Sequence, residues 1–300
     1  MTPAEIRNER VGPRAGALAL LAAVLWGGNS VFIKMGLDGM PPLAMAAVRF
    51  LLGALVVWAA AFFSGISCRV PQAQMRGLIG LALLFIAQIG LLNVGTDFTT
   101  AGRSTVLISA YPFFIALSAH FFIPGDRLNL SKALGLGCSF AGVVLILGRS
   151  LVLRESEYLL GDILVLVSGA LLGLRQVVLK RLVQGLHTYQ VLFWQATLSL
   201  PIFAALSLVF EADAPYDPTL PVIGAVLYQG VVVAGLCFIL WVSLLQHHSA
   251  SRLGIFGFVT PVIGVLLSGS LLQELLTWEL LASMGLVAAG IAVANRESSA

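Results

Sequence analysis

The sequence has few charged residues and few cysteines, and both shortages exclude classes of protein. Charged residues make up 10% of the 300 residues and hydrophobic residues 59%, whereas a soluble globular domain carries roughly 25% charged residues. The composition therefore predicts a membrane protein. The three cysteines, Cys68, Cys138 and Cys237, are too scattered for a metal site or an obvious disulfide pair, so we interpret them as small packing residues. A formal net charge of +3 is too small to indicate a nucleic-acid partner.

Several catalytic and energy-coupling motifs are also absent from the sequence. No Gly-x4-Gly-Lys-[Ser/Thr] phosphate loop occurs, which excludes an ATP-driven pump for this chain alone. An intramembrane enzyme remains a remote alternative, because there is no His-Glu-x-x-His, no Gly-x-Ser-x-Gly and no pair of acids within an apolar run. A receptor or scaffold would be expected to offer a longer polar loop or tail. We expect no cofactor and no metal.

The chain does contain apolar runs long enough to span a bilayer, which takes about 20 residues. The first run is too long for a signal peptide and has no clear cleavage site, so we interpret it as a retained span. The sequence predicts an all-α integral membrane protein with ten transmembrane helices, at residues 15–36, 42–63, 77–97, 104–123, 131–148, 160–180, 189–210, 221–245, 252–272 and 277–295.

The second set of runs repeats the first. Gly27 aligns with Gly173 and Lys34 with Lys180, both at an offset of 146 residues. Because each half holds an odd number of spans, five, the second half enters the membrane upside down. The result is a pair of inverted-topology five-helix repeats, which places a substrate site near mid-membrane between them.

The predicted organisation follows from these spans and from the basic residues. Most Lys and Arg residues outside the spans fall on the side of the N-terminus, so the positive-inside rule predicts that both termini are cytoplasmic. The expected divisions are a cytoplasmic N-terminal tail (1–14), a first repeat (15–148), a connector (149–159), a second repeat (160–296) and a C-terminal tail (297–300).

Short motifs in both halves resemble the EamA family of ten-helix carriers, in the drug/metabolite transporter superfamily. They are Trp26-Gly27, Phe32-Ile33-Lys34, Pro41-Pro42, Arg49-Phe50, Ser109-Ala110-Tyr111-Pro112, Gly125-Asp126-Arg127, Thr260-Pro261 and Gln273-Glu274. The second half departs from the pattern, with Leu172-Gly173 in place of Trp-Gly and Gln195 in place of Arg49. The resemblance implies metabolite transport, usually export across the bacterial inner membrane. The first span has no acidic residue, so the proton exchange of the four-helix multidrug relatives is not carried over.

Polar side chains within a bilayer are costly and are therefore candidates for substrate binding. Trp26 and Asn29 are one turn apart and share a helix face, so both could line one wall of a cavity. The alternative is that Asn29 bonds a neighbouring helix as a packing contact.

Two arginines fall within predicted spans, and each has two interpretations. Arg49 is either a counter-charge for a substrate carboxylate or a residue that snorkels or bonds helix-end carbonyls, and we prefer the second. Arg175 could also snorkel, but it aligns with Asn29 at the same offset of 146 residues. If both arginines face the cavity, the substrate carries an anionic group.

The other candidates are hydrogen-bonding residues and prolines. Predicted substrate ligands are Gln88, Asn93, Tyr111, Tyr228 and Gln229. Pro112 and Pro261 are equivalent in the two halves, and each is either a hinge or a fixed kink.

The favoured function is a secondary carrier that moves amino acids or related carboxylate-bearing compounds by alternating access. Carriage of nucleotide sugars or drug-like compounds is the alternative within the superfamily. The expected partners are the lipid bilayer and a small-molecule substrate, and the chain is expected to be a monomer or a homodimer. No carboxylate is predicted near mid-membrane, which argues against an Asp/Glu proton relay.

Overall fold

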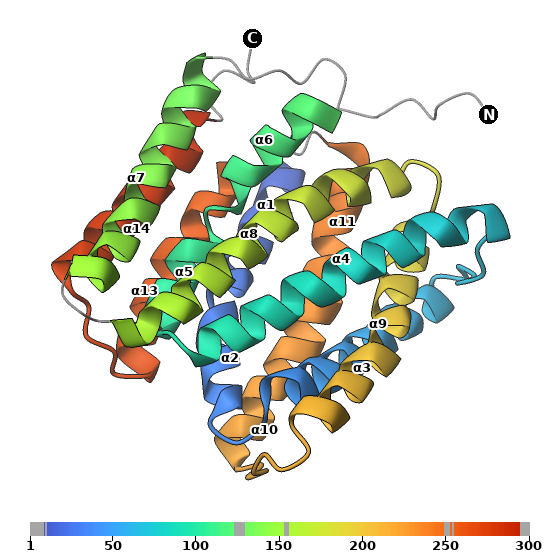
Figure 1. Cartoon of the computed structure of the whole chain (residues 1–300). Coiled ribbons are helices and arrows are strands. Elements are labelled where there is room, and N and C mark those ends of the chain that lie inside the picture. The colour runs from blue at the N-terminus through green and yellow to red at the C-terminus, as the bar shows by residue number, and fades with distance from the viewer. Residues whose placement is uncertain are drawn as a thin grey trace.

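The computed structural model describes residues 9, 11–122, 130–152, 156–248, 253 and 255–294. These residues are helical except for short connections and one isolated bridge between Glu9 and His248. The helices in chain order are α1 (Pro13–Gly27), α2 (Asn29–Leu37), α3 (Pro42–Phe63), α4 (Gln72–Asp97), α5 (Ala101–Ile108), α6 (Tyr111–Phe122), α7 (Leu130–Val152), α8 (Ser156–Leu182), α9 (Thr188–Phe210), α10 (Leu220–Leu227), the π-helix η1 (Tyr228–Cys237), α11 (Phe238–His247), the 3-10 helix η2 (Ile255–Phe258), α13 (Val259–Leu271) and α14 (Trp278–Ala294) (Figure 1).

The ten predicted spans are confirmed over the described residues; positions 123, 252, 254 and 295 of the predicted ranges lie outside them. Among the described residues, six helical stretches are long and apolar enough to cross a membrane by themselves: Pro13–Leu37, Pro42–Phe63, Gln72–Asp97, Glu157–Leu182, Thr188–Phe210 and Leu220–His247. The remaining four spans are α5 with α6, α7, η2 with α13, and α14. The largest difference from the predicted ends is at the third span, which begins at Gln72 and not at residue 77.

In the described part of the chain, four spans depart from a continuous α-helix, and two of these departures were not predicted. The fourth span breaks between α5 and α6 just before Pro112, and the ninth changes from the 3-10 helix η2 to α13 just before Pro261, where kinks were expected. The first span also breaks at Gly28, between α1 and α2, and the eighth contains the π-helix η1. Hydropathy alone gives no signal for these two features, because the apolar run continues through both.

The packing of the helices shows the two-fold relation of the halves. α3 packs against α9, and α7 against α14, so equivalent spans pair with each other. The contact of α4 with α8 joins the third span to the sixth, and its counterpart joins the eighth span to the first, through α10 with α2 and α11 with α1. Likewise, the contact of α6 with α8 has its counterpart in the contact of α13 with α1. In Figure 1, α7 and α14 lie side by side at one edge of the bundle.

Backbone contacts at the span ends show that equivalent spans run in opposite directions. The first span starts beside the end of α11, where the Glu9 N–H donates to the His247 carbonyl at 3.0 Å. It ends at the opposite face, where the Asp217 N–H donates to the Gly39 carbonyl at 3.0 Å. α8, the equivalent span, runs the other way. It starts near the face where the first span ends, with Asp162 bonded to Thr99 after the end of α4, and it ends at the face where the first span starts, with Lys180 bonded to the Leu245 carbonyl. The halves are therefore inverted repeats.

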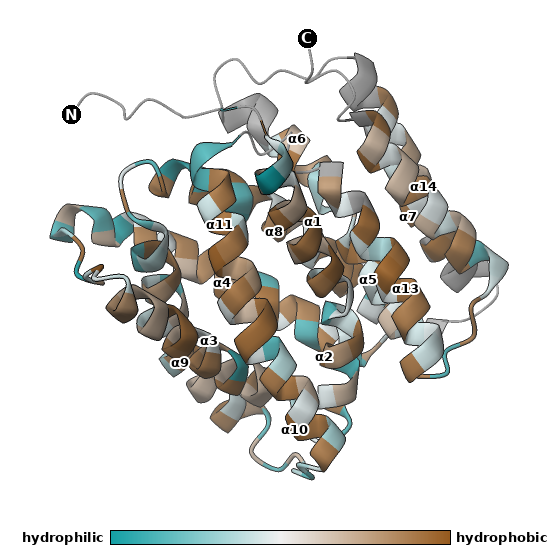
Figure 2. Ribbon diagram, turned by 180° about the vertical axis from the view of Figure 1, so that it is seen from behind, coloured by the Kyte–Doolittle hydropathy of each residue, from teal (hydrophilic) through white to brown (hydrophobic). Residues whose placement is uncertain are grey.

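The outer surface of the bundle is apolar, as a surface facing lipid tails must be. Large exposed side chains include Phe63, which is 86% exposed, and Leu208, Val209 and Phe210 near the end of α9. Figure 2 shows hydrophobic residues along the helix faces, with hydrophilic residues gathered mainly at helix ends and in the loops.

Candidate substrate-binding site

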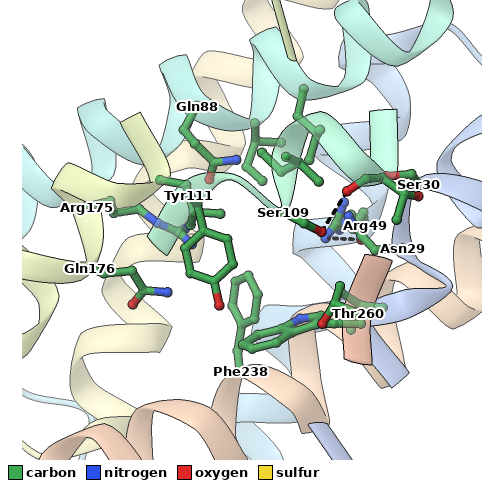
Figure 3. A pocket seen from close by; sticks show the side chains of 17 residues that line it. Asn29, Ser30, Arg49, Gln88, Ser109, Tyr111, Arg175, Gln176, Phe238 and Thr260 are labelled. Atoms are coloured by element: carbon green, nitrogen blue, oxygen red, sulfur yellow. Dashed lines mark hydrogen bonds between the residues drawn. The ribbon is translucent and has the colours of Figure 1, made fainter. Parts of the chain in front are cut away.

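A cavity of about 90 Å³ lies between the two halves, at the interruptions of the first and fourth spans. Both halves contribute to its wall: α1, α2, α3, α4, α5 and α6 from the first, and α8, η1, α11 and α13 from the second. Its lining residues are Trp26, Asn29, Ser30, Arg49, Gln88, Ile89, Leu92, Thr105, Ile108, Ser109, Tyr111, Leu172, Arg175, Gln176, Val233, Phe238 and Thr260 (Figure 3).

Side chains of the second half stabilise the break between α1 and α2. A broken helix leaves carbonyl groups without helical donors, and inside a membrane these must be satisfied by protein. The Tyr228 hydroxyl donates at 2.6 Å to one of them, the Leu25 carbonyl in the last turn of α1, and Gln229 Nε2 donates at 2.6 Å to the Asn29 carbonyl in the first turn of α2. Thr260 adds a bond from its hydroxyl to the Ala23 carbonyl at 3.2 Å.

The fourth span breaks between Ile108 and Tyr111, and at the equivalent place the ninth changes from the 3-10 helix η2 to α13. Pro112 has no N–H to donate within its helix, and the Ser109 hydroxyl donates to the Thr105 carbonyl at 2.7 Å. A Cβ atom at Gly257 would lie 3.4 Å from the Tyr111 hydroxyl, so the two interrupted spans approach each other here. Pro112 thus follows a helix break, and Pro261 a change of helix type, beside the cavity.

Arg49 lies in α3 and is 2% exposed. Its Nη2 donates to Asn29 Oδ1 at 3.2 Å, and its guanidinium carbon is 5.0 Å from the centre of the Phe50 ring. Its Nε and Nη1 have no hydrogen-bond partner among the described residues. The preferred sequence interpretation, that Arg49 snorkels or bonds helix-end carbonyls, does not fit this buried position at the cavity wall.

Arg175 enters the same cavity from α8 and is 5% exposed. Its guanidinium carbon lies 4.9 Å from the centre of the Phe85 ring and 5.6 Å from that of Phe238, so the cation contacts two aromatic rings. Its Nε and Nη1 also lack a hydrogen-bond partner in the described part of the chain. Arg175 and Asn29, which align in the two halves of the sequence, therefore line the same cavity.

The electrostatics of the cavity follow from its lining. Two guanidinium groups line it, and no Asp or Glu is among its described lining residues. A buried charge without an opposite charge is costly, and a partly unsatisfied guanidinium adds the cost of its unmade hydrogen bonds. The arrangement fits a bound carboxylate, whose two oxygens match the planar donors of arginine.

Six of the nine predicted substrate ligands line this cavity: Trp26, Asn29, Arg49, Gln88, Tyr111 and Arg175. Gln88 donates to the Ser168 hydroxyl at 3.1 Å, while its Oε1 has no partner among the described residues. Trp26 packs edge-on against Trp241, with ring centres 5.1 Å apart.

The other three predicted ligands do not line the cavity. Asn93 is fully buried and donates to the Pro42 carbonyl at 3.0 Å, which joins α4 to the start of α3. Tyr228 and Gln229 bond the backbone at the break in the first span, as described above. All three donate to backbone carbonyls and lie outside the lining, so they are not part of the site that we propose, although Asn93 Oδ1 and Gln229 Oε1 have no partner among the described residues.

The sequence reasoning missed polar residues that contribute to the lining. They are Ser30, Thr105, Ser109, Gln176 and Thr260. Gln176 is the largest of them, and the Oε1 of its buried side chain has no partner within the described ranges. An amide within an apolar run was the available signal, whereas small hydroxyl residues are common in membrane helices and carry none.

Two inverted helical repeats around a buried central cavity are the architecture of a secondary membrane carrier. The sequence model of the EamA-like transporter family matches the chain twice, over residues 14–148 and 159–296. The chain therefore belongs to the EamA-like transporter family, and it is a transporter and not an enzyme.

Similar proteins come from several microorganisms. A probable amino-acid metabolite efflux pump of Salmonella typhimurium is 30% identical over 286 residues, which cover 92% of this chain and 93% of that protein. The uncharacterized transporter YoaV of Bacillus subtilis is 24% identical over 269 residues, which cover 89% of this chain and 92% of that protein. A crystal structure with 21% identity has a TM-score of 0.72 and covers 94% of this chain and 98% of its own, which shows the shared fold.

Proposed function

We propose that the protein is a secondary carrier of small carboxylate-bearing metabolites, including amino acids and their derivatives. Arg49 and Arg175 bind the carboxylate in the central cavity. The observation that carries the proposal is that both arginines line one buried cavity with two unpartnered nitrogens each, and that its described lining residues include no acid.

The size and the lining of the cavity support a small metabolite over a nucleotide sugar. Sites for drug-sized ligands usually measure roughly 300–1,000 Å³, whereas this cavity measures about 90 Å³. A nucleotide sugar would also require several further cationic groups for its phosphates, and the described lining has two. The apolar part of a substrate would contact Trp26, Phe238 and Leu172.

Transport follows an alternating-access cycle in which one repeat tilts against the other about the central site. Pro112 and Pro261 act as hinges in this cycle, because one follows a break and the other a change of helix type in a span that borders the cavity. The basic residues of the loops support cytoplasmic termini, and the names of relatives support export across the bacterial plasma membrane.

The test is ligand binding and uptake by the purified protein with substitutions at both arginines. Carboxylates that raise the unfolding temperature of the wild type should not do so for Arg49→Gln or Arg175→Gln, and uptake into proteoliposomes should fall at least about tenfold, because a charge-assisted bidentate contact is lost. Arg181→Gln, at an exposed position of the same helix α8, is the matched control and should bind normally. Full binding by both cavity variants would refute the proposal.

A further inference from the structure

The charge balance of the cavity restricts its substrates beyond the presence of a carboxylate. Arg49 and Arg175 contribute two positive charges, and none of the described lining residues contributes a negative one. The two side chains are 2% and 5% exposed, so water screens their charges weakly. A ligand of this cavity should therefore compensate positive charge without adding to it.

A zwitterionic amino acid meets only half of this requirement. Its carboxylate can bind an arginine, but its ammonium enters a cavity that is already positive and offers no carboxylate in the described lining. Like charges at close range in a poorly screened site repel strongly. The ammonium therefore reduces affinity relative to the same molecule with a neutral group in its place.

The neutral acceptors of the cavity fit such a neutral group. Gln88 and Gln176 each have an Oε1 without a hydrogen-bond partner among the described residues, and both side chains are buried. An amide N–H or a hydroxyl can donate to these oxygens and does not need a positive charge to do so. An N-acylated amino acid offers the first donor, and a 2-hydroxy acid offers the second.

We propose that the carrier selects net-anionic carboxylates, such as N-acyl amino acids and 2-hydroxy acids, over the corresponding zwitterionic amino acids. This inference rests on the proposed function, since it assumes that the two arginines bind the substrate carboxylate. It goes further because it assigns the group on the carbon next to the carboxylate: a neutral hydrogen-bond donor that faces Gln88 or Gln176.

The experiment compares ligands that differ only in that group. Leucine, N-acetylleucine and 2-hydroxyisocaproate are titrated against the purified wild-type protein by thermal shift, and each is then tested as an inhibitor of N-acetylleucine uptake into proteoliposomes. We expect at least one of the two anions to bind about tenfold or more tightly than leucine. Leucine methyl ester, which keeps the ammonium and has no free carboxylate, should not bind.

The outcomes separate this inference from the proposed function. If leucine binds as tightly as both anions, and its binding is lost in Arg49→Gln and Arg175→Gln, the carboxylate site stands and the selection against the ammonium is refuted. If none of the three carboxylates binds, or if binding is unaffected in the arginine variants, the proposed function fails and this inference fails with it.

A variant that introduces a negative charge gives a second readout that does not depend on absolute affinity. Gln176→Glu places a carboxylate in the cavity wall with almost no change in side-chain size, and Gln176→Met is the control without charge. The ratio of leucine affinity to N-acetylleucine affinity should rise about tenfold or more in Gln176→Glu relative to Gln176→Met. An unchanged ratio in a variant with a normal unfolding temperature would contradict the charge argument.

Discussion

Lys34 and Lys180 perform the same structural task at opposite ends of the bundle. Lys34, in α2, donates from Nζ to the Thr96 and Asp97 carbonyls at 3.1 and 2.7 Å, at the end of α4. Lys180, in α8, donates to the Leu245 and His248 carbonyls at 2.6 and 2.9 Å, at the end of α11. Each lysine belongs to the leading span of its repeat and compensates the negative helix end of the third span.

Substitution of Lys180 should destabilise the fold because the end of α11 loses a cation. Lys180 is 3% exposed. A hydrogen bond to a charged group contributes about 1.5–3 kcal/mol to stability. We expect Lys180→Met to lower the free energy of unfolding by about 2 kcal/mol. Thermal unfolding in detergent measures the change. Arg181→Met, at the exposed neighbouring position, should have almost no effect; equal losses in both variants would contradict the assignment.

Removal of the charge of Asp162 should have a larger effect. Asp162 is fully buried and forms an ion pair with Arg103, and it also accepts from the Thr99 hydroxyl at 2.7 Å. Breaking one side of a buried pair leaves an uncompensated charge, so Asp162→Asn should cost about 3–5 kcal/mol. The double variant Arg103→Leu with Asp162→Leu should recover much of this loss in the same unfolding assay. A double variant no more stable than Asp162→Asn would show that the pair itself is not responsible.

Glu274 should stabilise the start of α5. Its carboxylate accepts from the Ala101 and Gly102 N–H groups at 2.7 and 2.9 Å, which otherwise have no helical acceptor. Glu274→Ala removes a capping acceptor and a negative charge at a helix N-terminus, and we expect a loss of about 1–2 kcal/mol by thermal unfolding. Asp213→Ala, which removes an exposed acid from a loop, serves as the control. A loss in Asp213→Ala as large as that in Glu274→Ala would argue against capping.

The equivalent glycines Gly27 and Gly173 should both resist enlargement. A Cβ at Gly27 would lie 2.6 Å from Ile263 Cβ in α13, and one at Gly173 would lie 2.5 Å from Phe114 Cβ in α6. Each substitution to alanine forces two helices apart, with an expected cost of about 1–3 kcal/mol. A Cβ at Gly80 meets no atom of the described residues outside its own helix turn within 4 Å, so Gly80→Ala should be tolerated. Unfolding temperatures and the yield of monodisperse protein compare the three variants; a tolerated Gly27→Ala would mean that the helices can separate at little cost.

The sequence was sufficient to predict the spans and their duplication. Span length follows from bilayer thickness. The offset of 146 residues that relates Lys34 to Lys180 is present in the sequence itself, whereas their shared structural role is not. Arg49 and Arg175 were found because charges within apolar runs are rare. The direction of each side chain was not predictable, since it depends on helix rotation and on breaks such as the one at Gly28. For that reason Tyr228 and Gln229 were expected to bind substrate, although they bond the backbone of the broken first span.

The ion pair between Arg103 and Asp162 makes the two ends of the carrier unequal. At the offset of 146 residues, the position equivalent to Asp162 is Gly16, which packs next to Phe256 and has no charge. Separation of the repeats at one end therefore works against a buried ion pair, whereas at the other end it works, among the described residues, against apolar packing and hydrogen bonds such as the one from Trp194 Nε1 to the Cys68 carbonyl. We expect the molecule to dwell for different times facing each side of the membrane. The two states would then have unequal populations in the resting protein, before any substrate or gradient is supplied.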